Sequence, residues 1–285
     1  MKRYVVPGYY HVVTRLPTPR IALFWTFNLL GVISLVAWSA AAMPLHDFAV
    51  VLFLGLGAWQ SLYEIGYLEN DLIATQREQK PTLRLDASTR ARLTAAYGRL
   101  VAAKWLVSSA LFVALVLYGQ WRGLDLNLTA FATWLLALRL VYLVHNSIRS
   151  RMAIATFALL QLMKYGALPL LVLASERSLF YLAVAAIPVP LTVLEYASLP
   201  RFAFKRLQLI MRPFPTSRVV YYLVVSSGAA VVWWFGPSPL THLALALALG
   251  MLCFRALAWW WLYHRGPADS GLRRQPRGPA GVDDG

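Results

Sequence analysis

Long apolar runs dominate the chain and decide what it can fold into. Eight stretches rich in Leu, Val, Ala and aromatic residues each approach the ~20 residues that a helix needs to cross a membrane. Hydrophobic residues make up 59% of the sequence and charged residues only 14%, whereas soluble domains have roughly 25% charged residues. We therefore predict an all-α polytopic transmembrane bundle of about eight or nine helices, with spans at residues 21–43, 48–67, 101–119, 126–146, 152–174, 179–199, 219–236 and 240–263.

The positive charges are distributed unevenly between the connections that join these runs. Most of the 27 Lys and Arg residues fall on the side that holds the N-terminus. This asymmetry predicts that both termini are cytoplasmic, and we expect an integral protein of the bacterial inner membrane. Much of the net charge of +15 is then a topology signal and a contact with anionic lipid, and we expect no nucleic-acid partner.

The end of the chain differs in composition from the rest. Residues 265–285 are rich in Gly, Pro, Arg and Asp and contain no apolar run. Such a composition cannot bury enough apolar surface to fold. We expect residues 1–264 to form a single transmembrane domain and residues 265–285 to form a disordered cytoplasmic tail.

Carboxylates are rare in this chain, yet four of the twelve cluster at the end of the second apolar run: Glu64, Glu69, Asp71 and Glu78. If the helix continues to Glu78, then Glu64, Asp71 and Glu78 recur every seven residues along one stripe. Oxygen ligands gathered in this way, with Asn70 beside them, suit Mg²⁺. The basic residues that follow can meet the negative charge of a phosphate or diphosphate, and these are Arg77, Lys80 and Arg84.

The same segment resembles the first aspartate-rich motif of the UbiA superfamily of intramembrane prenyltransferases. The matching residues are Asn70-Asp71-x-x-Ala74-x-x-x-Glu78, followed by Lys80-Pro81 and Arg84. The resemblance implies that Asn70, Asp71 and Glu78 bind Mg²⁺, which bridges to an isoprenoid diphosphate or a phosphorylated co-substrate. The chain departs from the family pattern where Ala74 replaces the middle Asp, and where Glu195 is the only acid in the region of the second motif.

Other polar residues could line the same cavity. We expect Arg139 and Lys164, inside two spans, to contact phosphate, together with Arg201 and Lys205 after the sixth run. Lys164 lies too deep to reach the interface easily, so we expect it to pair with a carboxylate or a phosphate, and Glu64 is the candidate carboxylate. We interpret Arg255 as an interfacial residue whose side chain reaches toward the tail side.

These features predict a Mg²⁺-dependent intramembrane transferase with a UbiA-like fold. The expected substrate is an isoprenoid, a polyprenyl phosphate or prenyl diphosphate lipid, and the reaction is prenyl or phosphoribosyl transfer with a phosphorylated sugar or another co-substrate. The predicted catalytic residues are Asp71, Glu78 and Glu64. One alternative is a transporter or lipid flippase that uses intramembrane charges, and another is a non-catalytic assembly partner of a membrane enzyme.

Overall fold

A computed structural model gives the fold of most of the chain. It describes residues 2–16, 18, 22–23, 25–41, 43–77, 83–148, 150–172, 178–211 and 214–265. Over these ranges the chain is helical and contains no strand. The predicted tail at residues 265–285 lies outside them, apart from its first residue.

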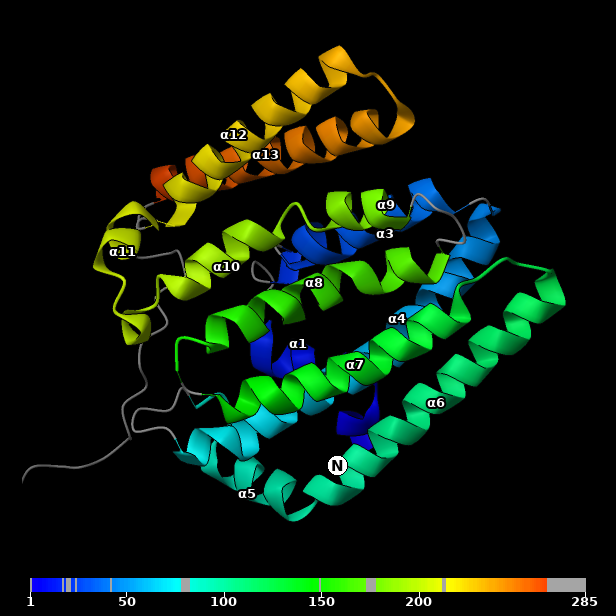
Figure 1. Cartoon of the computed structure of the whole chain (residues 1–285). Coiled ribbons are helices and arrows are strands. Elements are labelled where there is room, and N and C mark those ends of the chain that lie inside the picture. The colour runs from blue at the N-terminus through cyan, green and yellow to red at the C-terminus, as the bar shows by residue number, and fades with distance from the viewer. Residues whose placement is uncertain are drawn as a thin grey trace, which may run out of the picture.

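The helices follow one another with short connections (Figure 1). The N-terminal half comprises η1 (Lys2–Val5), α1 (Tyr9–Arg15), the π-helical η2 (Thr26–Gly31), α3 (Val32–Ala40), α4 (Leu45–Leu72), η3 (Ala74–Arg77), α5 (Ala87–Ala95) and α6 (Tyr97–Arg122). The second half comprises α7 (Leu128–Ser147), α8 (Ala153–Val172), α9 (Ser178–Ala185), α10 (Val189–Ala197), η4 (Pro200–Phe202), α11 (Lys205–Met211), α12 (Phe214–Phe235) and α13 (Pro239–Arg265).

Six helices within the described ranges are long and apolar enough to cross a membrane, and they confirm the helical membrane bundle in outline. These segments are Leu45–Gln76, Tyr97–Arg122, Leu128–Ser147, Ala153–Val172, Phe214–Phe235 and Pro239–Trp261. The predicted orientation, with cytoplasmic termini, stays a prediction. Figure 1 shows α5 and α11 toward one end of the bundle and the α6–α7 connection at the other.

One of the eight predicted spans is broken into two helices, and another is described only in part. The run at 179–199 divides into α9 and α10, because Pro188 and Pro190 lack the backbone N–H that a continuous helix requires. The run at 21–43 is helical at residues 22–23 and from residue 25 to Ala40, with the π-helical turn η2 inside it, and residues 21, 24 and 42 lie outside the described ranges. The number of membrane spans stays a prediction, and the run at 179–199 is the one that the described residues show to be broken.

The helix α4 also ends earlier than the carboxylate stripe requires. It stops at Leu72, and the 3-10 turn η3 follows. The side chains of Thr75 and Gln76 donate hydrogen bonds to the backbone carbonyls of Asp71 and Leu72, which satisfy two of the acceptors left free at a helix end. The continuous helix to Glu78 is therefore not formed, and Glu78 itself lies outside the described residues.

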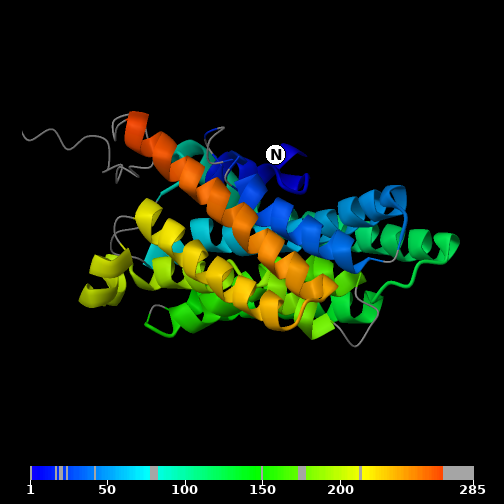
Figure 2. The ribbon, with the colours of Figure 1, turned by 90° about the horizontal axis from the view of Figure 1, so that it is seen from above.

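The core of the bundle lies around α4. This helix packs against α6, α7 and α8 and is the most deeply buried of the six candidate spans. Helices α12 and α13 form a hairpin that packs mainly on itself, with smaller contacts to α3, α9 and α10. Figure 1 shows this hairpin as a separate layer, and in Figure 2 it crosses over the rest of the bundle.

The close contact between α4 and α7 depends on Gly66. A Cβ atom at this position would lie 2.2 Å from the ring of Tyr142, so no other residue fits without displacing that ring. By contrast, a Cβ atom at Gly228 in α12 would meet no atom within 4 Å.

We predict that Gly66→Ala destabilises the fold by about 1–3 kcal/mol, because overpacking a filled core forces neighbours to move. The matched variant Gly228→Ala should be neutral or slightly stabilising, since Ala favours a helix over Gly. Thermal melting of the purified proteins in detergent compares the two. Equal melting midpoints for Gly66→Ala and the unchanged protein would contradict the contact.

Candidate functional site

Three acidic residues in the C-terminal part of α4 each pair with a cation from another part of the chain. Glu64 pairs with Lys104 of α6, Glu69 with Arg139 of α7, and Asp71 with Arg15 and Arg84. Burying a carboxylate without a partner is expensive, so these pairs decide which segments dock on α4.

Glu64 and Lys104 form a fully buried ion pair, with 0% of either side chain exposed and 2.6 Å between Oε2 and Nζ. The other carboxylate oxygen of Glu64 accepts a hydrogen bond from the backbone N–H of His11 at 2.6 Å. The predicted Glu64–Lys164 pair is therefore wrong. Lys104 takes that place because α6 begins at Tyr97, which carries Lys104 about two turns into a helix packed against α4.

Arg139 forms an ion pair with Glu69. Its Nη2 donates to Oε1 at 2.5 Å and its Nη1 donates to Oε2 at 3.3 Å, while the hydroxyl of Tyr97 also donates to Oε1. Arg139 is buried and lines neither of the two cavities that lie beside this cluster. Its predicted contact with phosphate therefore finds no support in the geometry.

Asp71 is surrounded by hydrogen-bond donors. Arg15 contacts both carboxylate oxygens at 2.9 and 3.0 Å, and Arg84 contacts Oδ1 at 3.1 Å. The hydroxyl of Tyr10 donates to Oδ2 at 2.9 Å, and the side-chain amide of Asn70 donates to Oδ1 at 3.2 Å. These donors place Asp71 at the centre of a salt-bridge network, and a Mg²⁺ ion bound to its carboxylate would compete with Arg15 and Arg84 for the same oxygens.

The predicted magnesium site is only partly described. Among the described residues, no three His, Cys, Asp or Glu side chains lie close enough together to hold a metal ion. Glu78 and Lys80 lie outside the described residues, and only the backbone of Arg77 is placed. Mg²⁺ binding by Asn70, Asp71 and Glu78 therefore stays a prediction.

The N-terminal segment is part of the site, which the sequence pattern did not predict. Helix α1 docks on α4 through three of its residues. Tyr10 and Arg15 donate hydrogen bonds to Asp71, and the backbone N–H of His11 donates one to Glu64. The charges before the first apolar run were interpreted only as topology signals. The spacing of His11 and Arg15, four residues apart and hence on one helix face, is the signal that could have identified them.

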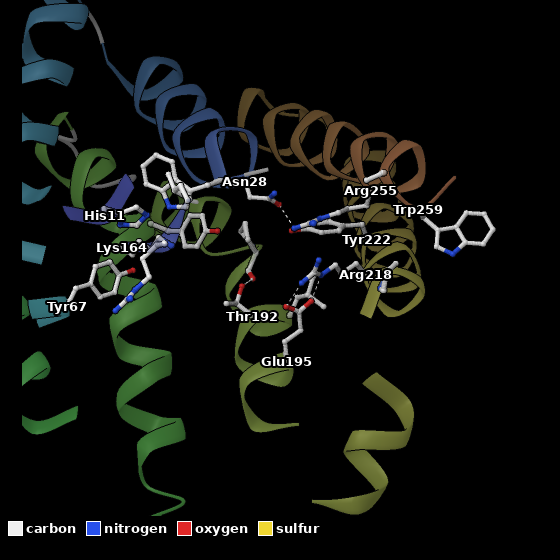
Figure 3. A pocket seen from close by; sticks show the side chains of 18 residues that line it. His11, Asn28, Tyr67, Lys164, Thr192, Glu195, Arg218, Tyr222, Arg255 and Trp259 are labelled. Carbon is white, nitrogen blue, oxygen red and sulfur yellow. Dashed lines mark hydrogen bonds and ion pairs between the residues drawn. The ribbon is translucent and has the colours of Figure 1, made fainter. Parts of the chain in front are cut away.

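A cavity of about 340 Å³ lies between α1, α8, α10 and the α12–α13 hairpin. Figure 3 shows His11, Tyr67 and Lys164 on one side of it and Glu195, Arg218 and Arg255 on the other. We call it the first cavity, and its lining residues are His11, Arg15, Leu16, Trp25, Asn28, Tyr67, Lys164, Tyr165, Pro188, Leu191, Thr192, Glu195, Pro215, Arg218, Tyr222, Arg255, Ala258 and Trp259.

Among the described residues, four cations and one carboxylate line the first cavity. Glu195 is bound by Arg218, whose Nε and Nη2 donate to its two oxygens at 2.5 and 2.9 Å. Arg255 donates to the neutral side chain of Asn28 at 2.5 Å, so it faces the cavity rather than the lipid interface predicted for it. The balance of charge in the cavity is therefore positive, and it favours an anion.

A second, more polar cavity of about 230 Å³ adjoins the first. Asn70, Arg84 and Arg201, all singled out from the sequence, line it, whereas Lys205 is exposed and lines neither cavity. Arg15 and Tyr67 line both cavities, and the guanidinium of Arg15 lies 4.3 Å from the centre of the Tyr67 ring. One stacked pair thus separates the two spaces.

We predict that Glu64→Gln lowers stability by about 3–5 kcal/mol, because it leaves the Lys104 ammonium buried without a counter-charge. The double variant Glu64→Gln with Lys104→Met should recover most of that loss, since the side-chain oxygen of the new glutamine still accepts the His11 N–H. Melting midpoints in detergent measure both. A double variant no more stable than the single one would show that the charge pair is not the cause.

Acid should destabilise the chain through His11. Burial, followed by the charges of Lys164 and Arg15, lowers the pKa of His11 to about 3 from its ordinary value of 6.5. Because the unfolded state binds the proton more readily, this contribution is complete above pH 6.5 and is lost as pH falls toward 3. At a pH of about 4.5 we expect a loss of about 2–3 kcal/mol relative to a pH of about 7.5.

The measurement is the melting midpoint of the unchanged protein and of His11→Gln at these two pH values. On going to the lower pH, the unchanged protein should lose more of its melting midpoint than His11→Gln does. The titration of all other groups is common to both proteins. A gap that does not change with pH would contradict the neutral, buried imidazole.

No family model, curated protein or solved structure matches this chain. The resemblance to the UbiA superfamily therefore rests on the residues between Asn70 and Arg84 and on the helical layout, and it stays a prediction. The two cavities carry the evidence for function.

Proposed function

We propose that this protein is an intramembrane transferase that acts on a polyprenyl phosphate or prenyl diphosphate lipid. The observation that carries the proposal is the first cavity, in which Arg15, Lys164, Arg218 and Arg255 accompany Glu195, the one carboxylate among the described lining residues. Cations gathered inside an apolar bundle are costly unless they have a partner or a function. An anionic lipid headgroup would supply that partner.

The apolar part of the same lining suits the rest of such a lipid. Leu16, Trp25, Leu191, Ala258 and Trp259 lie on the walls with the charged residues. A ligand with a phosphate at one end and a hydrocarbon chain at the other matches this mixture, because each part meets groups of its own kind. A soluble sugar phosphate alone would leave the apolar wall unused.

The second cavity supports a transfer between two substrates rather than simple binding. It contains Arg84 and Arg201 together with the amide side chains of Asn70, Asn146 and Gln161. These groups suit a phosphorylated, hydroxyl-rich co-substrate. Because the two cavities meet at Arg15 and Tyr67, reacting groups bound in them would lie next to each other.

The chemical contribution of the protein is electrostatic in this proposal. The fixed cations neutralise negative charge that grows on a phosphate or diphosphate leaving group, and they act strongly because apolar helices exclude bulk water. If Mg²⁺ binds as the resemblance implies, it would add charge neutralisation at the leaving group. The lipid tail is held in place by the apolar walls, which keeps the reacting groups aligned.

The alternative of a transporter or flippase makes different demands on the charges. Coupled transport uses intramembrane charges that change partners, whereas Glu64, Glu69 and Glu195 are each held in a close ion pair with Lys104, Arg139 and Arg218 respectively. These close pairs leave the three carboxylates already neutralised, which favours a binding site over a transport pathway. A non-catalytic assembly partner would have no use for two adjoining cavities.

The test uses the full chain purified in detergent, with a radiolabelled polyprenyl phosphate and phosphoribosyl diphosphate, and separately with prenyl diphosphates and candidate acceptors. We expect a new lipid product in one of these mixtures. No product in any of them, combined with movement of a labelled lipid across proteoliposomes that contain the protein, would favour the flippase instead.

We further predict that Asp71→Ala reduces the rate at least about 100-fold, because Arg15 and Arg84 lose the carboxylate that positions them between the cavities. Asp47→Ala is the matched control, since Asp47 is a buried carboxylate of the same helix that pairs with Arg122, and neither residue lines a cavity. Product formation in EDTA would refute the magnesium prediction and leave the transferase proposal intact.

A further inference from the structure

His11 carries two buried nitrogen atoms that have no partner within the described protein. The residue is only 3% exposed, and neither Nδ1 nor Nε2 makes a hydrogen bond. A buried polar group normally has a partner, so an exception that lines a cavity points to a ligand that supplies one.

The position of His11 is fixed by its surroundings. Its backbone N–H is bonded to Glu64, which the buried Lys104 holds in turn. Its ring packs against Trp25 and Tyr67, with centroids 4.7 and 5.3 Å away. The unpaired nitrogens are therefore not the result of a loosely held helix, because three separate contacts hold the imidazole at the wall of the first cavity.

Lys164 is the cation beside His11 that is not neutralised by a carboxylate. In the described part of the chain, Arg15 is paired with Asp71 and Arg218 with Glu195, whereas no carboxylate lies within 4 Å of the Lys164 ammonium. The ammonium nitrogen lies 5.9 Å from the centre of the Tyr165 ring. Figure 3 shows Lys164 on the same side of the cavity as His11.

We propose that His11 and Lys164 together bind the phosphate oxygens of the lipid substrate, and this rests on the function proposed above. Lys164 supplies the charge that attracts an anion, and a ring nitrogen of His11 donates a hydrogen bond to it. A cationic ligand is excluded because Lys164 would repel it, and a neutral lipid would leave the ammonium group without a counter-charge. Headgroup recognition then belongs to α1 and α8 rather than to the acidic cluster.

Equilibrium binding of radiolabelled undecaprenyl phosphate to the purified full chain tests this without any turnover. We expect His11→Phe, which keeps an aromatic ring but no nitrogen, and Lys164→Met to weaken binding about tenfold or more each. His11→Gln keeps a donor and should stay within about threefold of the unchanged protein. His242→Phe, a histidine on α13 outside both cavities, is the matched control.

Two further probes identify what is recognised. Undecaprenol lacks the phosphate, so its weaker binding should not change in His11→Phe or Lys164→Met. Inorganic pyrophosphate should compete poorly with undecaprenyl phosphate if the headgroup is recognised as part of a lipid. Full competition by pyrophosphate that is lost in the same two variants would assign His11 and Lys164 to a soluble phosphate instead. Unchanged affinity for undecaprenyl phosphate in a folded His11→Phe protein would overturn the proposal.

This binding experiment distinguishes the recognition pair from the proposed function. Binding that depends on His11 and Lys164, with no product in any transfer mixture, would refute the transferase and leave the recognition pair standing. Product formation with unchanged affinity in both variants would refute the recognition pair and leave the transferase standing.

Discussion

The need to neutralise carboxylates inside an apolar bundle governs the arrangement of this protein. Glu64 is fully buried on the central helix α4, and its two oxygens are used by Lys104 of α6 and by the backbone of His11 in α1. A charge that loses its partner at this depth costs several kcal/mol, so the pairing fixes which helices dock where. The first cavity is a consequence, because the same docking brings His11 and Arg15 to its wall.

The membrane fold was largely predictable from the sequence, because a run of about 20 apolar residues has few alternatives to a spanning helix. The interruptions were harder to predict. Pro188 and Pro190 were visible in the sequence, but the surrounding run is apolar on both sides and gave no sign that the break would separate two short helices. The end of α4 at Leu72 depends on two side chains, Thr75 and Gln76, that bond to the last carbonyls.

The site was predicted less completely than the fold. Asn70, Asp71 and Arg84 do come together, because they belong to one short segment and its continuation. The partners of Glu64 and Arg139 could not be predicted, since they depend on which helices pack against α4, and no local pattern separates Lys104 from Lys164. His11 and Arg15 were missed because basic and polar residues before a membrane span usually report topology alone.

The α12–α13 hairpin has a consequence for how the protein is made. It packs mainly on itself, yet it supplies Arg218, Tyr222, Arg255 and Trp259 to the first cavity. Both helices leave the ribosome after the helices that pack around α4. The core around α4 can therefore assemble in the membrane while one wall of the cavity is still missing, and a chain shortened before Phe214 would insert and pack its core but would have no complete binding space.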